Sequence, residues 1–386
     1  MRGITAVGSL GVLIRGENSG ELLGTTHLVA TSKCYLYKTC NCMPGFITPI
    51  CEYTSQTFKN SLFCGILANT LLSTVPGLSG AGPDPNGSLL VPVLDAELIT
   101  NGKITSSSAT PNTATGCPTP ALITLAMMEL IDHAPLFVNA GLCHTPTVPC
   151  YDLYGEVGGD PRHGSALQDP QRLFEAGKRL GQKLTRCYDL IFIGECVPGG
   201  TTTALLVLRA LGYQARVSSA YQKNPSALKD EVAASVFSRL DQERCRDPWY
   251  VMQTCADPMM PVACGIAAGC DPFRTRLFLA GGTQMLAVAA LIKALGHTVP
   301  DVATTVYIYD DPLANSLEIA HQINTPIWYV NPDFGELGHK GLARYCLGEV
   351  KEGMGAGGAM MLAYLLGKSP DEIKNAILMQ ANAYTA

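Results

Sequence analysis

The sequence predicts a three-layer α/β/α protein with a mostly parallel, doubly wound sheet, plus a small helical subdomain from the chain ends. Three observations predict this fold. Apolar runs of strand length alternate with apolar helices, and glycine-rich turns join the two. Only 15% of the residues are charged, against about 25% in an average domain. Alternating strands and helices imply parallel pairing, with helices on both faces of the sheet.

The composition excludes several broad classes of protein. Of the 386 residues, 47% are hydrophobic, and the net charge is −5. Disorder needs low hydrophobicity and high charge, and nucleic-acid binders usually carry basic runs, which this sequence lacks. The longest apolar stretch, 277–296, contains a Gly-Gly-Thr break, so we expect no membrane span. We also expect a cytoplasmic location, because the N-terminus shows no signal-peptide pattern.

The 15 cysteines follow no known metal-binding pattern. Ten lie singly between 117 and 346 and are expected to be thiols, mostly of apolar, core-like character. The others crowd the N-terminal segment, at spacings that match neither a zinc ribbon nor a ferredoxin: Cys34, Cys40, Cys42, Cys51 and Cys64. The cysteine spacings therefore predict no metal site, and we expect no cofactor.

The clearest structural unit lies in the middle of the chain. Residues 170–184 repeat apolar positions at helical spacing, and 190–193 form a continuous apolar strand. A glycine-rich turn, 194–200, then leads into an apolar helix, 201–211, which Gly212 ends. Residues 277–296 repeat this order of strand, turn and helix.

The other elements are predicted in the same way. Ser369, Pro370 and Glu372 are typical of a capping box at the start of the last helix. Other expected helices cover 121–131, 226–240, 315–323 and the residues up to 366, and other strands cover 136–138, 302–308 and 327–330. A polar segment, 141–169, is either a surface excursion or a lid.

The glycine-rich turns fall at carboxyl ends of strands, where α/β sheets bind ligands. Free main-chain N–H groups, the helix dipole and hydroxyls favour a phosphate at the first turn, built from Gly194, Gly199, Gly200, Thr201, Thr202 and Thr203. The turn lacks the lysine of a P-loop, which favours a mononucleotide phosphate used as a handle. A tight turn without a ligand is the alternative. A second candidate turn contains Gly281, Gly282 and Thr283.

Two carboxylates accompany these turns. Glu195 lies inside the first turn, where a negative charge needs a partner or a task. Glu352 precedes a glycine run that includes Gly353 and Gly355, and main-chain donors or burial there would tune its pKa. Cys196 lacks the Cys/His signature of a nucleophile, so we expect a structural thiol.

These stretches resemble the nicotinate-nucleotide–dimethylbenzimidazole phosphoribosyltransferase superfamily. The segment GECVPGGTTTALLVLRALGY is similar to that family's phosphate-binding loop and helix. The resemblance is closer to a divergent, mostly uncharacterised prokaryotic branch and covers about residues 72–386. There it includes VPGLSGAGPDP (75–85), DAELITNG (95–102), LFVNAGL (136–142), ADPMMP (256–261), LAGGTQMLAV (279–288), GHKGLARY (338–345) and VKEGMGAGGAMMLAYLLG (350–367).

The resemblance implies a base exchange at the ribose C1′ of nicotinate mononucleotide. Nicotinate leaves and 5,6-dimethylbenzimidazole or a related base replaces it, which gives α-ribazole phosphate for the lower ligand of a cobamide. The resemblance makes Glu352 the general base, with Glu195 as a second catalytic candidate. Gly353 and Gly355 join the nucleotide-binding set, and base-binding candidates are Ser79, Gly80, Asn139 and His339. It also implies a homodimer.

The chain is thus divided into a segment 1–70, assigned to the small subdomain, a nucleotide-binding core 71–350, and a catalytic C-terminal segment 351–386. Two other functions stay open. The first alternative is a nucleosidase, or a transferase with another acceptor, on the same fold. The second is a protein that binds a mononucleotide without catalysis. No nucleic acid or membrane is expected as a partner.

Overall fold

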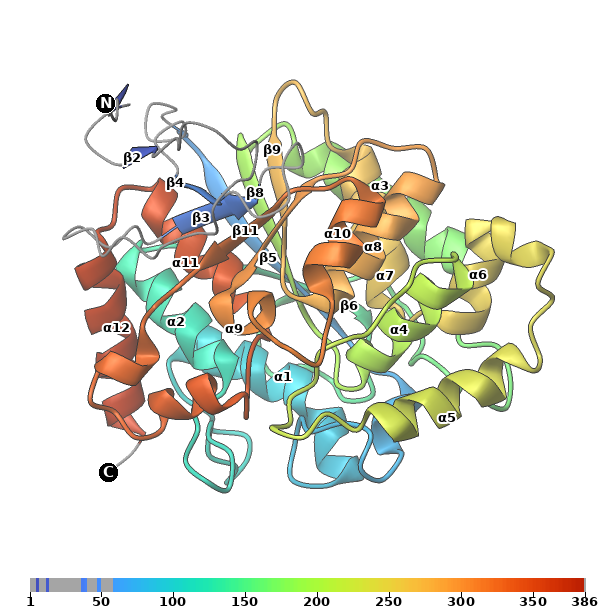
Figure 1. Cartoon of the computed structure of the whole chain (residues 1–386), viewed down its shortest axis with the longest axis horizontal. Coiled ribbons are helices and arrows are strands. Elements are labelled where there is room, and N and C mark those ends of the chain that lie inside the picture. The colour runs from blue at the N-terminus through green and yellow to red at the C-terminus, as the bar shows by residue number, and fades with distance from the viewer. Residues whose placement is uncertain (1–4, 7–11, 14–35, 40–46, 50–57, 385–386) are drawn as a thin grey trace, which may run out of the picture.

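The computed structural model describes residues 58–384 and four short strands nearer the N-terminus (Figure 1). Those strands are β1 (Thr5–Ala6), β2 (Val12–Leu13), β3 (Leu36–Thr39) and β4 (Ile47–Pro49). The predictions for Cys34, Cys40, Cys42 and Cys51 lie outside the described residues.

A nine-stranded sheet forms the middle layer, in the order β4-β3-β11-β10-β9-β8-β5-β6-β7. Its parallel part consists of β5 (Ser61–Ala68), β6 (Leu136–Gly141), β7 (Cys150–Asp152), β8 (Leu190–Cys196), β9 (Arg276–Ala280), β10 (Asp301–Thr305) and β11 (Ile327–Val330). β3 and β4 extend the sheet in antiparallel fashion beyond β11. The predicted mostly parallel sheet is confirmed.

The sheet is wound in two directions. From β5 the chain adds β6 and β7 on one side, then returns to place β8, β9, β10 and β11 on the other. The order therefore reverses between β5 and β8. Because crossover connections are right-handed, the reversal puts helices on both faces of the sheet.

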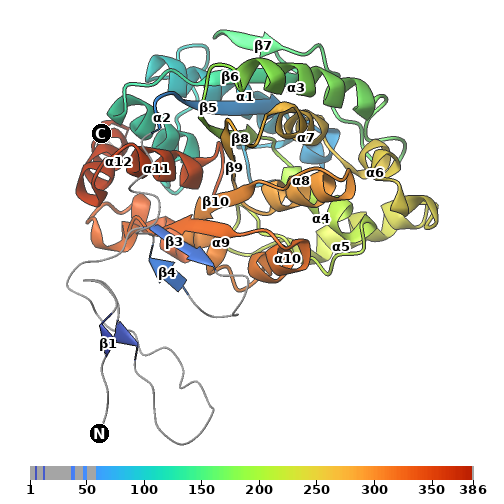
Figure 2. The same cartoon turned by 90° about the horizontal axis from the view of Figure 1, so that it is seen from above.

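Each face has its own helical layer and its own hydrophobic core (Figure 2). One layer contains α3 (Pro170–Leu184), α4 (Gly200–Ala210), α5 (Ser226–Phe237), α6 (Pro248–Cys255), α7 (Met259–Gly269), α8 (Thr283–Ala294) and α10 (Ser316–Ile323). The other contains α1 (Pro85–Asn101), α2 (Pro120–Leu130), α11 (Ala356–Leu365) and α12 (Pro370–Ala383). The predicted three-layer α/β/α architecture is confirmed.

Alternation along β8 shows how one strand serves both cores. Ile191 and Ile193 belong to the core beneath α7 and α8, and Leu190 and Phe192 belong to the core beneath α2 and α11. Successive side chains of a strand point to opposite faces, so a continuous apolar run is what a doubly covered strand requires.

The C-terminal helices belong to the layer that α1 and α2 form on one face of the sheet, and their assignment to a small subdomain stays a prediction. α12 packs on α2, and α11 packs on α2 and against the sheet. The predicted capping box at Ser369 and Glu372 is present at the start of α12. From the N-terminal segment, the described strands β3 and β4 line the sheet edge beside β11 (Figure 2).

The sequence pattern misses several elements and extends one too far. The expected strand 302–308 ends at Thr305, and α9 (Val306–Tyr309) begins there. β5, α1, α6 and α7 were not predicted, because β5 lies in a stretch rich in Gly and Cys, and α7 is apolar on all sides. Within the described residues, no helix is both long and apolar enough to cross a membrane.

Candidate functional site

Three adjacent strands bring candidate residues to one level at the carboxyl edge of the sheet. β8 pairs with β9 up to Ile193–Leu279, β9 pairs with β10 up to Ala280–Ala303, and the Gly281 N–H donates to the Ala303 carbonyl at 2.8 Å. Glu195, Gly281 and Thr304 follow within two residues of these pairs along the three strands. Neighbouring strands lie about 4.8 Å apart, so these positions span roughly 10 Å. β8 also borders the point where the strand order reverses. Doubly wound sheets bind ligands at such points.

Main-chain donors surround the carboxylate of Glu352. Its Oε2 accepts hydrogen bonds from the Thr305 N–H and the Thr304 hydroxyl, both at 3.1 Å. Its Oε1 accepts from the N–H groups of Gly353 and Gly357, both at 3.2 Å. Burial raises the pKa of this carboxyl to about 7, although these donors oppose the shift. The group can therefore exchange a proton near neutral pH.

Close packing of α11 against the sheet makes this arrangement possible. A Cβ at Gly357 would lie 2.1 Å from the carbonyl carbon of Thr304, so only glycine fits there. Gly355 begins α11 with a φ of 66°, and a Cβ there would lie 3.0 Å from the Cα of Gly194. Gly194 and Gly355, both predicted to bind nucleotide, thus pack against each other between β8 and α11.

Glu195 is almost completely buried at the end of β8. Its Oε2 accepts hydrogen bonds from the Val197 N–H at 3.1 Å and from Gln284 Nε2 at 2.9 Å. Burial raises the pKa of Glu195 well above its usual range, and the carboxylates of Asp257 and Glu352 raise it further. Such a carboxyl ionises readily only when positive charge arrives beside it.

Asp257, just before α7, is a third carboxyl of this cluster, and the sequence did not single it out. Its Oδ2 accepts a hydrogen bond from the Thr203 hydroxyl at 2.5 Å, and its Oδ1 accepts from the Met259 N–H at 3.1 Å. Burial raises its pKa to about 6. Thr203, predicted as a phosphate donor, therefore already bonds to a protein carboxylate.

Cys196 and Asp95 form a second buried pair, on the face opposite to Glu195. The Cys196 thiol donates to Asp95 Oδ2 at 3.3 Å. Burial raises the pKa of Asp95 to about 7 and the pKa of the thiol well above its usual range. A thiol that stays protonated is a poor nucleophile, which agrees with the structural role expected for Cys196.

The N-terminus of α4 offers fewer free main-chain donors than the sequence suggests. The Gly200 N–H donates to the Val197 carbonyl, and the Thr202 N–H donates to the Gly199 carbonyl, both at 2.9 Å. A Cβ at Gly200 would lie 1.9 Å from Gln284 Nε2, so this glycine makes room for a protein side chain. The expectation that successive N–H groups of this turn are free is therefore corrected.

Side-chain hydroxyls are the donors that this region leaves open. Among the described residues, Thr202 Oγ1 on α4 and Thr283 Oγ1 on α8 are buried without a hydrogen-bond partner. An unsatisfied buried hydroxyl costs about 1–3 kcal/mol, so both positions favour a polar ligand. Of the neighbouring glycines, Gly281 lies near Glu195, and Gly282 packs against Ile308.

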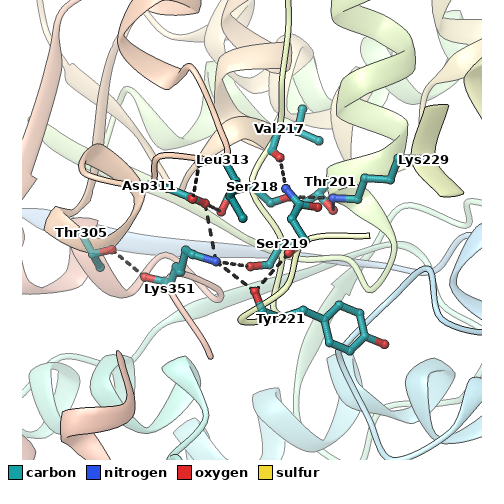
Figure 3. A network of polar contacts seen from close by, with 11 residues as sticks. Thr201, Val217, Ser218, Ser219, Tyr221, Lys229, Thr305, Asp311, Leu313 and Lys351 are labelled. Atoms are coloured by element: carbon teal, nitrogen blue, oxygen red, sulfur yellow. Dashed lines mark hydrogen bonds and ion pairs between the residues drawn. The ribbon is translucent and has the colours of Figure 1, made fainter. Parts of the chain in front are cut away.

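A buried lysine that sequence reasoning missed completes this side of the site (Figure 3). Lys229, in α5, is only 1% exposed. Its Nζ donates to the Thr201 hydroxyl at 3.1 Å and to the Ser218 carbonyl at 2.7 Å. One feature of the sequence could have indicated its burial: Lys229 lies on the same helix face as Val232 and Val236, which are buried. A lysine at an apolar position of a helix needs a buried partner.

A second buried lysine, Lys351, precedes Glu352 directly and shares a carboxylate with this network (Figure 3). Its Nζ lies 3.5 Å from Asp311 Oδ2, which also accepts a hydrogen bond from the Ser218 hydroxyl at 2.7 Å. Burial, and then the ammonium of Lys351, lowers the pKa of Lys229 to about 7. The network thus holds two amino groups and one carboxylate. Its positive groups outnumber its negative ones, which favours the binding of an anion.

The first two base-binding candidates lie next to this network. The Tyr221 hydroxyl donates to the Ser79 carbonyl at 2.7 Å. A Cβ at Gly80 would lie 2.4 Å from the carbonyl oxygen of Ala220. The loop around Ser79 and Gly80 therefore packs directly on the segment that bonds to both lysines.

The other two base-binding candidates are engaged in local structure. Asn139 Oδ1 accepts hydrogen bonds from the N–H groups of Gly141 and Leu142, which fixes the end of β6. His339 Nδ1 accepts from the Leu342 N–H at 3.1 Å, at the start of a 3-10 helix. Their assignment to base binding stays a prediction.

The long segment 141–169 contains β7 and is held by an internal ion pair and by a hydrogen bond to α6. Asp160 pairs with Arg162 at 2.6 Å, and the Leu167 N–H donates to the Gln253 carbonyl at 3.0 Å.

The described cysteines are free thiols. In the part of the chain that the structure describes, no three His, Cys, Asp or Glu residues are grouped to hold a metal ion.

The doubly wound sheet, with carboxyls gathered at its switch point, defines an α/β protein of a known fold. A crystal structure of nicotinate-nucleotide–dimethylbenzimidazole phosphoribosyltransferase from Thermus thermophilus matches with a TM-score of 0.55 and 12% identity, over 83% of both chains. A crystal structure of CobT from the same organism matches with a TM-score of 0.52 and 15% identity, over 84% of both chains. The chain has the fold of these proteins.

Sequence relatives give the family. The chain is 40% identical over 330 residues to a UPF0284 protein of Methanosarcina acetivorans, which covers 83% of this chain and 93% of the relative. It is 42% identical over 323 residues to a UPF0284 protein of Thermococcus gammatolerans, with 82% and 96% covered. The chain belongs to the UPF0284 family. No protein-family model matches it.

Proposed function

We propose that this protein is a phosphoribosyltransferase that moves the ribose 5-phosphate of nicotinate mononucleotide onto 5,6-dimethylbenzimidazole or a related base. The observation that carries the proposal is the pair of electrostatically coupled carboxyls, Glu195 at the end of β8 and Glu352 beside the end of β10, on the carboxyl edge of the sheet. The likeness in fold to nicotinate-nucleotide–dimethylbenzimidazole phosphoribosyltransferase supports the class of reaction.

The two carboxyls suit bond exchange at a ribose C1′. Cleavage of a glycosidic bond passes through a transition state of oxocarbenium character, which nearby carboxylates stabilise. Positive charge at C1′ favours ionisation of Glu195, whose burial otherwise opposes it. Because Glu195 is shielded from water, its attraction to that charge is strong.

Glu352 is the proposed general base. One nitrogen of the acceptor base forms the new bond to C1′, while the bond to nicotinate breaks and its electron pair leaves with nicotinate. The proton on the other nitrogen of the acceptor base passes to Glu352. A carboxyl with a pKa of about 7 is a much better proton acceptor than an exposed glutamate.

The nucleotide phosphate is assigned to the N-terminus of α4 where it meets Lys229 of α5. Lys229 supplies the positive charge there, the Thr201 hydroxyl that it contacts supplies a polar group, and Thr202 adds a buried hydroxyl without a partner in the same turn. A phosphate also balances the charge of a network that holds two lysines and one carboxylate. This assignment replaces the cradle of main-chain N–H groups expected from the sequence.

The test is turnover with a panel of acceptor bases. Protein is mixed with nicotinate mononucleotide and either 5,6-dimethylbenzimidazole, another benzimidazole or a purine, and products are identified by mass spectrometry. We expect nicotinate and a base-ribose phosphate in equal amounts with at least one benzimidazole. Absence of both products with every base contradicts the proposal.

The same experiment separates the two alternatives. Nicotinate release that needs no added base indicates a nucleosidase. Binding of nicotinate mononucleotide without release indicates a non-catalytic nucleotide-binding protein. The raised pKa of Glu352 favours a catalyst over a non-catalytic binding protein, because simple binding has no use for a proton acceptor there.

We further propose a homodimer that acts in the cytoplasm, as the resemblance and the sequence pattern imply. Analytical ultracentrifugation should give twice the mass of 41.0 kDa for one chain. A sedimenting species with the mass of one chain contradicts the dimer, and recovery of the native protein in the membrane or secreted fraction contradicts the location.

A further inference from the structure

Lys351 touches both halves of the proposed site. At its side-chain end, Nζ donates to the carbonyls of Ser219 at 3.0 Å and Tyr221 at 3.3 Å, and it pairs with Asp311 (Figure 3). The same segment supplies the Ser218 carbonyl that holds Lys229. The ammonium of Lys351 therefore fixes the chain that positions the proposed phosphate-binding lysine.

At its main-chain end, Lys351 is tied to the proposed base. Its carbonyl accepts a hydrogen bond from the Thr305 hydroxyl at 2.6 Å. The N–H of the same threonine donates to Glu352 Oε2 at 3.1 Å. A single residue of β10 thus holds both the peptide of Lys351 and the carboxylate that follows it.

These contacts form one continuous path through largely buried groups. It starts at Thr201 and ends at Lys351, which is joined to Glu352 by the chain itself. The bonds along it are Thr201–Lys229, Lys229–Ser218, Ser218–Asp311 and Asp311–Lys351. Buried polar groups that satisfy one another in this way move together, because displacing one leaves its neighbour without a partner.

We propose that Lys351 is a positioning residue that couples an anion bound beside Lys229 to the placement of the Glu352 carboxylate. The inference rests on the proposed function for the identity of the anion as the phosphate of a nucleotide. An anion attracts the Lys229 ammonium, which changes its hold on Ser218. Lys351 passes this change to the turn that carries Glu352.

The coupling has a use in catalysis. A base misplaced by about 1 Å can lower the rate by about 100-fold. With the coupling, Glu352 reaches its working position only when a nucleotide occupies the phosphate site. The proposed transferase thereby limits proton transfer to the loaded enzyme.

The first experiment measures the coupling without turnover. Hydrogen–deuterium exchange of the full chain is followed with and without inorganic phosphate. In the wild type, phosphate should slow exchange of amides in two segments, 217–221 and 353–357. Segment 353–357 contains the N–H groups of Gly353 and Gly357, which donate to Glu352. Lys351→Met should keep the first effect and lose the second.

Matched variants separate coupling from folding. Lys351→Met leaves the buried Asp311 without its ammonium, so Lys351→Met/Asp311→Asn is made beside it. The double variant should regain thermal stability yet still lose the phosphate effect at 353–357. Lys340→Met, at an exposed position, should behave like the wild type.

Turnover gives a second, independent readout. Because Lys351 holds the turn that carries Glu352, Lys351→Met/Asp311→Asn should lower kcat by about 100-fold, and the change in the nucleotide KM should be much smaller than the fall in kcat. If Lys351 had a purely structural role, the double variant would change the stability of the protein but would not lower kcat selectively.

Two results overturn the inference: phosphate that leaves exchange at 353–357 unchanged in the wild type, and a phosphate effect at 353–357 that persists in Lys351→Met/Asp311→Asn. A wild type that shows the coupling but does not convert nicotinate mononucleotide contradicts the proposed function and still supports the role of Lys351.

Discussion

Burial acts on the individual residues of this site in opposite directions and brings their pKa values toward neutrality. It raises the pKa of carboxyls and lowers the pKa of lysines, because the charged form loses its hydration in both cases. The affected groups are Lys229, Asp257 and Glu352. A site of this kind can exchange protons at pH 7.

The sequence could indicate the carboxylates but not the lysines. Glu195 and Glu352 stand in glycine-rich turns, and such turns at strand ends are visible in the pattern. Lys229 meets Thr201 only because α5 folds back beside α4, and Lys351 meets Asp311 across another loop. Contacts of this kind depend on tertiary packing, which the spacing of residues does not record.

Lys229→Met tests the proposed phosphate site. A hydrogen bond from an ammonium to an anion contributes about 1.5–3 kcal/mol, so affinity for nicotinate mononucleotide should fall by about 10- to 100-fold. Isothermal titration calorimetry measures this. Lys223→Met, an exposed lysine just before α5, is the control and should bind normally. Equal binding by both variants would place the phosphate elsewhere.

The dependence of kcat/KM on pH should be bell-shaped with a maximum near neutrality. As pH rises through about 7, Glu352 loses its proton and becomes a base, which raises the rate. Lys229 loses its proton at about the same pH, which weakens phosphate binding and lowers kcat/KM. Lys229→Arg should remove the alkaline limb, because arginine keeps its charge. An unchanged alkaline limb in Lys229→Arg contradicts the assignment.

At the scale of elements, the strand–turn–helix units were the most predictable part of the fold. The segments around β8 and β9 show apolar strands, glycines and apolar helices in sequence order, and the structure confirms them. β5 is not predicted, although it is an interior strand between β8 and β6. Its stretch SLFCGILA holds a glycine and a cysteine, and its register depends on pairing with β6 and β8.

Gly357→Ala tests the contact between α11 and β10. The new methyl group would meet the Thr304 main chain, so α11 must move away from the sheet and take Glu352 with it. We expect a loss of about 1–3 kcal/mol in the free energy of unfolding, together with loss of turnover. Urea denaturation and nicotinate release measure the two effects.

A second glycine provides the control for this substitution. Nothing lies within 4 Å of a Cβ placed at Gly164, so Gly164→Ala should leave stability and turnover nearly unchanged. If Gly357→Ala behaves like Gly164→Ala, then the close approach of α11 does not determine the position of Glu352.

At the scale of the whole molecule, the buried charges reduce stability in favour of function. When the pKa of a carboxyl is higher in the folded chain than in the unfolded chain, the unfolded chain releases the proton at a lower pH. Folding therefore becomes less favourable as pH rises between the two pKa values. Asp95, Asp257 and Glu352 all have raised pKa values of about 6 or 7. Their combined penalty grows as pH rises toward neutrality, where the proposed reaction needs Glu352 ionised.

Asp95→Asn tests this penalty. The pKa of Asp95 is about 7 in the folded chain against an ordinary value of 3.8, so the penalty grows between these two pH values and is constant above them. The variant should gain stability over the wild type as pH rises from about 4 to 7, by up to about 4 kcal/mol. Urea denaturation at several pH values measures the gain, and the exposed Asp132→Asn is the control. A gain that does not change with pH contradicts this explanation.

The central claim is that Glu352 is the base of a phosphoribosyl transfer. The most direct measurement compares wild type, Glu352→Gln and the exposed control Glu175→Gln in product formation and in binding of nicotinate mononucleotide. We expect Glu352→Gln to bind the nucleotide as the wild type does but to form at least about 100-fold less product, since general base catalysis contributes about 10²–10⁴-fold. Full product formation by Glu352→Gln would contradict it.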